Sequence, residues 1–283
     1  MNIKTIIVPL DFSNESLDGL NMALMLAKKT GANVEMVHVI GKNTDNTYEF
    51  LEQENHLAKT KFEEILQKCK DGGNINCALK YIIKEGKIFS EISDLADKCE
   101  DSLIVLSTHG ESGFEDLFIG GNAYKIISHS KNPVITVRKS KISPNINKIV
   151  LPLDITLETR EKVPYTVNLA RLFGSEIHLI TVRSSHLKSI EKKLLKYTEQ
   201  VCAFLWEHDI PYKVEHLQSG NLTDVILNYS VSVSADLISI MTEQERSVSN
   251  LLLGTYAHQM INKATIPVLC FPNYHLGNYA EDL

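Results

Sequence analysis

The sequence predicts an α/β fold of two tandem domains, each a parallel sheet flanked by helices. Short apolar runs of strand length alternate with segments that carry apolar residues at helical spacing. The pattern of the first half restarts near residue 147, where NKIVLPLDIT echoes IKTIIVPLDFS near the N-terminus. Strands that alternate with helices imply a parallel sheet with right-handed crossovers. With 283 residues, the chain has room for two domains, which we expect at 1–140 and 146–275.

The first strand is expected at Thr5–Leu10, and Ser13 is a candidate N-cap for the helix that follows it. Glycine is common just after a helix, so this helix should end at Gly31. A second apolar run, Val34–Ile40, predicts the next strand. A polar loop at Gly41–Thr47 then leads into a long amphipathic helix.

A third strand is expected at Ala78–Ile83, stopped by Gly86. The helix after it has apolar residues on one side and delivers the chain to Leu103–Leu106, a run typical of a buried parallel strand. The last apolar run of the first copy is Val134–Val137.

Between these last two runs lies a glycine-rich loop with Gly110 and Gly113, then a helical segment and the pair Gly120–Gly121. Glycines just after a strand and at the start of a helix let backbone N–H groups approach an anion, because no Cβ stands in the way. We interpret the segment as a phosphate-cradling loop. The local pattern leaves open that these are ordinary turn glycines.

The second copy repeats the landmarks of the first. The Pro-Leu-Asp triplet at 9–11 recurs at 152–154, and Gly31 recurs as Gly174 at the same offset. Pro164 falls inside the expected first helix of this copy. An interior proline costs about 3 kcal/mol, so that helix is either kinked or begins near Val163 with the proline in its first turn.

Composition excludes several classes of function. The formal charge of −6 argues against a general nucleic-acid binder, and no apolar run approaches the roughly 18 residues of a membrane span. The N-terminus enters a strand directly, so we expect no signal peptide and a cytoplasmic location. The five cysteines lack CxxC spacing and are expected as free thiols, and no metal site is readable.

Three features together resemble the universal stress protein family. They are a strand that ends in Asp11, an apolar strand that ends in His38–Val39, and a loop close to Gly-x2-Gly-x9-Gly-[Ser/Thr]. The resemblance covers nearly the whole chain. It implies in each domain a five-stranded parallel sheet of the Rossmann-like, adenine nucleotide hydrolase-like type. It also implies, as in many members, ATP at the carboxyl ends of the strands, where open α/β sheets bind ligands.

The first copy matches the family's loop in part. Gly110 and Gly120 take the second and third glycine positions. Ser107 stands in the place of the first glycine, and Gly121 in the place of the final Ser or Thr. Asn122 is expected to replace part of the lost hydroxyl function.

On the family's pattern, Asp11 and the Val39 backbone face adenine and ribose. From the residues alone, two simpler interpretations stay open: Asp11 as a helix cap and Val39 as a strand core residue. We expect His109 to position a ligand rather than to catalyse. The candidate nucleotide-binding residues are Pro9, Leu10, Asp11, Val39, Leu106, Ser107, His109, Gly110, Gly113, Gly120, Gly121 and Asn122.

The second copy departs further from the loop motif. Met241 and Gln244 stand where two glycines are expected, and Glu243 and Glu245 flank the loop. Carboxylates would repel phosphates in a partly buried site. We therefore interpret this domain as structural or as a different sensor.

The predicted function is a stress-response protein that binds ATP, or AMP or ADP, with Mg²⁺ in its N-terminal domain. The motifs GxGxxG, GxxxxGK[ST] and GxSxG are absent, so we expect no enzyme beyond slow ATP hydrolysis. The alternative is a nucleotide-free interaction module. The resemblance implies that Val134–Val137 and Val268–Phe271 pair as an intramolecular pseudo-dimer, with homodimerisation open. We expect no nucleic-acid or membrane partner, and the sequence identifies no protein partner.

Overall fold

The computed structural model describes residues 3–41, 47–72, 77–108, 119–138, 142–156, 158–182, 188–217, 220–242, 245–246 and 251–272. The chain divides into two compact units, Asn2–Lys139 and Ser140–Leu283, with Met1 grouped in the second. In each unit, strands and helices alternate around a parallel sheet. The predicted α/β fold is confirmed.

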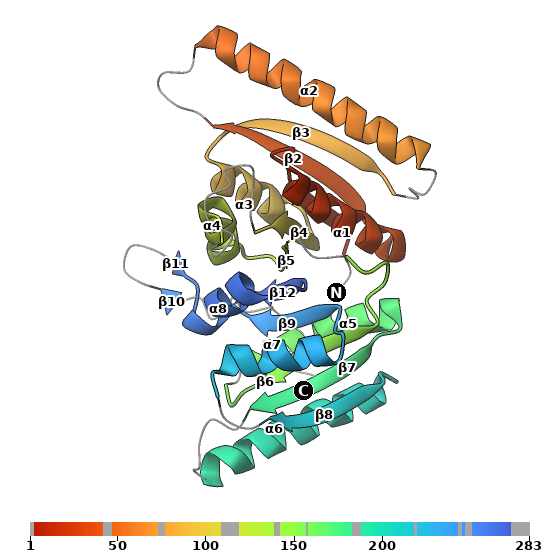
Figure 1. Ribbon diagram of the computed structural model, residues 1–283, viewed down its shortest axis with the longest axis vertical. Coiled ribbons are helices and arrows are strands. Elements are labelled where there is room, and N and C mark those ends of the chain that lie inside the picture. The colour runs from red at the N-terminus through yellow and green to blue at the C-terminus, as the bar shows by residue number, and fades with distance from the viewer. Residues whose placement is uncertain are drawn as a thin grey trace. The chain divides into compact units, whose positions relative to one another are not determined.

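The first unit repeats a strand-then-helix pattern along the chain (Figure 1). Its elements in order are β1 (Thr5–Pro9), α1 (Asn14–Thr30), β2 (Asn33–Gly41), α2 (Tyr48–Asp71), β3 (Leu79–Gly86), α3 (Ile88–Lys98), β4 (Ser102–Ser107), α4 (Gly121–His129) and β5 (Val134–Val137).

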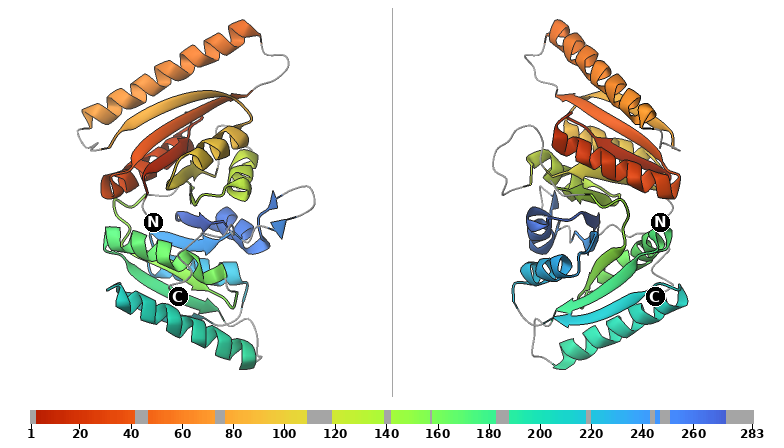
Figure 2. Two further views of the ribbon diagram at one scale, coloured as in Figure 1. Left: turned by 180° about the vertical axis from the view of Figure 1, so that it is seen from behind. Right: turned by 45° about the vertical axis from the view of Figure 1, so that its right-hand side comes forward.

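The strands of the first unit lie in the order β3-β2-β1-β4-β5, and all neighbours pair in parallel. Right-handed crossovers place α1 and α2 on one face of this sheet and α3 and α4 on the other. Accordingly, α2 lies over β2 and β3, and α3 packs against α4 (Figures 1 and 2). Because parallel strands all end at the same edge, the segments that follow β1, β2 and β4 lie close together.

The second unit repeats this arrangement. Its elements in order are β6 (Lys148–Leu153), the 3₁₀ turn η1 (Glu158–Arg160), α5 (Lys162–Phe173), β7 (Glu176–Val182), α6 (Lys188–Glu207), β8 (Tyr212–Leu217), α7 (Leu222–Ser232), β9 (Leu237–Met241), β10 (Glu245–Arg246), β11 (Leu251–Leu252), α8 (Thr255–Lys263) and β12 (Val268–Phe271). The parallel order is β8-β7-β6-β9-β12, and β10 pairs with β11 in antiparallel fashion.

Glycines end the first helix of both units, as predicted. Gly31 has a φ of 73°, and its N–H donates to the carbonyl of Ala27 at 2.8 Å. Gly174 has a φ of 69°, and its N–H bonds to the carbonyl of Ala170. A residue with a Cβ is strained in this left-handed region, which is why glycine is the usual residue here.

Pro164 lies in the first turn of α5, which begins at Lys162. The N–H that proline lacks would have no intrahelical acceptor in this turn, so the helix loses no hydrogen bond. Of the two alternatives left open by the sequence, the later helix start is confirmed.

The third strand is longer than predicted. The apolar run stops at Ile83, but β3 continues through Lys84 and Glu85 to Gly86, because these residues pair with the end of β2. Backbone pairing therefore extends this strand beyond its apolar residues. Among the described residues, no helix combines the length and apolar character that crossing a membrane requires.

Candidate functional site

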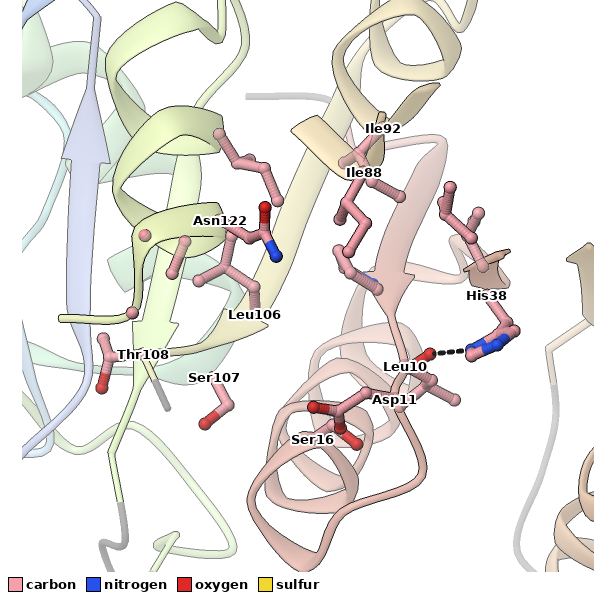
Figure 3. A pocket seen from close by; sticks show the side chains of 17 residues that line it. Leu10, Asp11, Ser16, His38, Ile88, Ile92, Leu106, Ser107, Thr108 and Asn122 are labelled. Carbon is pink, nitrogen blue, oxygen red and sulfur yellow. Dashed lines mark hydrogen bonds between the residues drawn. The ribbon is translucent and has the colours of Figure 1, made fainter. Parts of the chain in front are cut away.

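A cavity of about 190 Å³ opens at the carboxyl edge of the first unit's sheet, where β1 and β4 are neighbours. The chain leaves β1 toward β2 but leaves β4 toward β5, so this is the topological switch point at which open α/β sheets bind ligands. The lining comes from the ends of β1, β2 and β4 and from the helices α1, α3 and α4 (Figure 3).

The candidate residues that the structure describes all line this one cavity. They are Pro9, Leu10, Asp11, Val39, Leu106, Ser107, Gly120, Gly121 and Asn122. The remaining three, His109, Gly110 and Gly113, lie outside the described residues. The fold thus brings together residues more than a hundred positions apart in the sequence, and their contact with a ligand stays a prediction.

Asp11 orders the start of α1. Its Oδ1 accepts hydrogen bonds from the N–H and the hydroxyl of Ser13, at 3.0 and 2.5 Å. Oγ of Ser13 in turn accepts from the N–H of Ser16 at 3.1 Å, which confirms Ser13 as the N-cap. Asp11 therefore supports the cap indirectly and also lines the cavity, so the structure is compatible with both interpretations of this residue.

The two neighbouring glycines have different surroundings. The N–H of Gly120 donates to the carbonyl of Thr108 at 2.7 Å, and a Cβ on Gly120 would lie 3.2 Å from that oxygen. Gly120 is therefore held close to Thr108, the residue that follows β4. Gly121 begins α4, and a Cβ there would meet nothing within 4 Å.

The first turn of α4 offers backbone donors to the cavity. Gly121 and Asn122 both line it, and N–H groups in the first turn of a helix have no intrahelical acceptor. Together with the partial positive charge of a helix start, such groups form a favourable place for an anion.

His38 belongs to the lining but was not among the candidate residues. Its Nδ1 donates to the carbonyl of Leu10 at 2.8 Å (Figure 3), which ties the end of β2 to the segment after β1. Its ring packs on Phe12, with centroids 4.8 Å apart, and Phe12 has the unusual φ of 67°. The sequence did contain a signal for His38, because it precedes Val39 in the motif of the second strand. Only the backbone of Val39 was taken as a candidate for ligand binding.

Apolar side chains form another part of the lining, and none of them was among the candidate residues. Ile88 and Ile92 come from the start of α3, and Ala123 and Ile126 come from α4. Helical spacing indicates which face of a helix is apolar, but not where that face passes the edge of the sheet.

The described lining of the first cavity contains no lysine or arginine, and its carboxylate is Asp11. An anionic group would therefore interact there with helix starts and backbone N–H groups. In the described ranges, no group of three or more His, Cys, Asp and Glu side chains is placed to hold a metal ion. A Mg²⁺ that accompanies a nucleotide is bound through the phosphates, water and one or two carboxylates, and Asp11 is the carboxylate that the described lining offers.

Comparison with known proteins identifies the family. The model of the universal stress protein family matches twice, at residues 2–138 and 145–272. The chain belongs to the universal stress protein family.

Universal stress proteins from two organisms align with it. One from Synechocystis is 21% identical over 292 residues, covering 95% of this chain and all of that protein. One from Methanocaldococcus jannaschii is 29% identical over 145 residues, covering 49% of this chain and 84% of that protein.

Solved universal stress proteins share the fold. The crystal structure of one from Archaeoglobus fulgidus matches with a TM-score of 0.77 at 20% identity, covering 95% of this chain and 96% of that one. The structure of a putative one from Pseudomonas aeruginosa matches with a TM-score of 0.66 at 17% identity, covering 95% and 93% of the two chains.

The second universal stress protein domain has a smaller cavity, of about 100 Å³, at the corresponding switch point between β6 and β9. Met241 lies at the end of β9, where the first domain has Ser107, and Tyr256 lies in α8, where the first has Asn122. Glu243 and Gln244 are outside the described residues, so the predicted effect of this loop on phosphates stays a prediction.

Proposed function

We propose that the N-terminal universal stress protein domain binds ATP, or a related adenine nucleotide such as ADP or AMP, together with Mg²⁺. Binding would change conformation or association rather than drive turnover. The observation that carries this proposal is the cavity at the switch point, which joins an apolar wall to the first turn of α4.

The size and polarity of the cavity support an adenine ligand. A cavity of about 150 Å³ can hold benzene, so about 190 Å³ is in scale with a larger planar base. The base would lie against Ile88 and Ile92, and the phosphates near Gly121 and Asn122 at the start of α4. The family's pattern, with Asp11 and Val39 at the adenine and ribose end, agrees with this orientation of the nucleotide.

A regulatory role is favoured over a catalytic one. The described titratable side chains of the lining are Asp11 and His38. Oδ1 of Asp11 accepts from Ser13, and Nδ1 of His38 donates to Leu10, so both have structural hydrogen bonds. We infer at most slow ATP hydrolysis. We also retain a cytoplasmic location and the domain limits 1–140 and 146–275 as part of this proposal.

Calorimetric titration of the full chain with ATP and Mg²⁺ tests the proposal, alongside mass spectrometry of the denatured protein for nucleotide carried through purification. We expect one ATP per chain, with ADP and AMP competing for the same site. No heat of binding at about millimolar ATP, where even weak affinities are measurable, together with no co-purified nucleotide would reject it.

The alternative function is a nucleotide-free interaction module. It is favoured by the large apolar side chains that α2 exposes, since Tyr48 is 75% exposed and Phe50 and Leu57 are also exposed. Scattered apolar residues are ordinary on protein surfaces, so this observation is weaker than the cavity. The same titration separates the two functions, because a pure interaction module binds no nucleotide.

The assembly of the chain is a further part of the proposal. An intramolecular pairing of the last strands of the two domains, β5 and β12, stays a prediction from the family resemblance. Light scattering on the purified chain would show whether whole chains also associate. A nucleotide-dependent change in mass would link association to binding.

A further inference from the structure

A lysine side chain is buried at the cavity of the second domain. Lys162, at the start of α5, is only 3% exposed and lines the cavity of about 100 Å³. Its Nζ donates to Oγ1 of Thr159 at 3.0 Å, and this buried threonine lines the same cavity. Lysine is almost never fully buried unless its charge is paired or hydrogen-bonded. The chain itself therefore holds this ammonium group in place.

The residues before this lysine repeat three hydrogen bonds of the first domain. In each domain a carboxylate accepts from the N–H and the hydroxyl of the residue two positions on, and that hydroxyl oxygen accepts from the N–H three positions further. The residues are Asp11, Ser13 and Ser16 in the first domain and Asp154, Thr156 and Thr159 in the second. The same offset, which also relates the helix ends Gly31 and Gly174, places Gly19 opposite Lys162.

Gly19 is buried in α1 and faces the end of β4. A Cβ on Gly19 would lie 3.5 Å from the backbone nitrogen of Ser107 and 3.6 Å from the carbonyl carbon of Leu106, which are ordinary contacts. Both of these residues line the first cavity. A methyl group therefore fits at this position, whereas a longer side chain has to extend past the strand end. In the second domain, the side chain of Lys162 reaches the cavity.

The two cavities differ in the room that they offer. The first is about 190 Å³ in volume and the second about 100 Å³, which is below the roughly 150 Å³ of a cavity that holds benzene. Met241 and Tyr256 also replace smaller residues of the first domain. Lys162, however, brings a long side chain to a position where the first domain has none.

We propose that the size of the residue at this helix position determines whether the cavity of a domain admits a ligand. In the second domain the side chain of Lys162 is itself the occupant, held by Thr159. In the first domain Gly19 leaves room for a nucleotide, and this half of the inference rests on the function proposed above.

Titration of the full chain with benzene tests the second domain by NMR, with ¹³C labels on isoleucine and methionine methyl groups. Ile226, Ile240 and Met241 report from the cavity, and the probe is uncharged because Asp154 stays in the lining. Lys162→Ala should show saturable shifts of these signals below about 10 mM benzene, a range that reveals millimolar affinity. The unmodified chain should show none. Lys162→Met, which keeps the length of the side chain without its charge, should also show none.

Titration with ATP and Mg²⁺ tests the first domain. Gly19→Lys recreates the arrangement of the second domain, because Ser16 holds the place of Thr159 and lines the first cavity. Gly19→Lys and Gly19→Met should each weaken ATP binding at least about tenfold through loss of room. Gly19→Ala is the matched control, and its affinity should stay within about threefold of that of the unmodified chain. Circular dichroism checks that each variant is folded.

Several outcomes would overturn the proposal. These are an absence of saturable shifts in folded Lys162→Ala, equal benzene binding in Lys162→Met, and equal ATP affinity in the unmodified chain and folded Gly19→Met. Stronger ATP binding in Gly19→Lys would show that charge rather than size matters at this position, and would also reject it. An unmodified chain that binds no ATP would reject the proposed function alone, because the benzene titration decides the inference for Lys162 independently.

Discussion

The two domains of this chain place a cavity at the same switch point of the same fold. Both linings hold a Pro-Leu-Asp triplet, at 9–11 and at 152–154, but the cavities differ in volume and at the start of the helix that follows the loop. The first is about 190 Å³ in volume, with Gly120, Gly121 and Asn122 at a helix start. The second is about 100 Å³, with a tyrosine at that helix start and Lys162 in the lining. The order of strands therefore determines where a cavity lies, and the residues at strand ends and helix starts determine what it can hold.

The largest expected difference between the two domains is the effect on ATP affinity of substitutions in the loops that contain Gly110 and Gln244. Gly110→Val should weaken ATP binding at least about a hundredfold, because a side chain would displace phosphates from backbone donors whose charged hydrogen bonds are individually strong. Gln244→Val, in the corresponding loop of the second domain, should leave the affinity unchanged. Calorimetric titration of both variants measures this, and equal effects would mean that the nucleotide is not confined to the first domain.

A change at the start of α4 should alter the affinity for ATP about tenfold. A side chain at Gly121 enters open space beside the cavity, so Gly121→Val should leave the fold intact while it crowds the ligand and weakens ATP binding about tenfold. Thr255→Val, at the first residue of α8, is the matched control and should bind ATP as the unmodified chain does. Unchanged affinity in Gly121→Val would place the phosphates elsewhere.

Gly120, the neighbour of Gly121, should affect the stability of the fold. A Cβ at Gly120 would lie 3.2 Å from the carbonyl oxygen of Thr108, so Gly120→Ala should lower the free energy of unfolding by about 1 kcal/mol through crowding. Gly121→Ala should be nearly neutral, since its Cβ meets nothing within 4 Å. Urea denaturation of the pair measures the difference, and equal stabilities would show that the loop relaxes without cost.

A smaller expected difference between the two domains is how their stability depends on pH in the acidic range. In the second domain, Oε1 of Glu176 accepts hydrogen bonds from His178 at 2.8 Å and Lys213 at 3.1 Å. Burial alone would raise the pKa of Glu176, but these hydrogen bonds outweigh burial and hold the pKa below its ordinary value of 4.5. The equivalent positions of the first domain carry Asn33 and Glu35 in place of the Glu176–His178 pair.

Because the pKa of Glu176 is lowered by folding, its stabilising effect is complete above about pH 4.5 and is lost as the pH falls further. Glu176→Gln should therefore lower stability by at most about 1 kcal/mol at neutral pH, since the group is partly exposed. The variant and the unmodified chain should converge in acid. Denaturation at about pH 7 and about pH 3.5 measures this, and Glu35→Gln serves as the control that should not show the convergence.

Much of the fold could be predicted from the sequence because its signals are local. The capping by Ser13, the left-handed glycine at position 31 and the proline in the first turn of α5 each depend on the chemistry of a few adjacent residues. The end of β3 could not be predicted this way, since pairing with a neighbouring strand, rather than its own apolar residues, extends it to Gly86.

The candidate site also has some residues that the sequence predicts and others that only the structure reveals. Asp11 and the glycine pair were found through a motif of fixed spacing, and the described members of that set line one cavity. His38 and Ile88 were missed as lining residues, because their place depends on where a strand end and a helix start meet in space. The distinction between Gly120 and Gly121 also needed coordinates, since only the position of Thr108 shows which glycine is crowded.

The position occupied by Gly19 in one domain and by Lys162 in the other has a practical consequence for protein engineering. In the first domain this helix position faces the backbone of Ser107 at the end of β4, and in the second domain its side chain lines the cavity. A library built at this one position would vary the size and charge of a side chain at the end of the strand that borders the cavity, while the other residues keep their native identity. The ligand preference of such a domain could then be redesigned through a single helix residue.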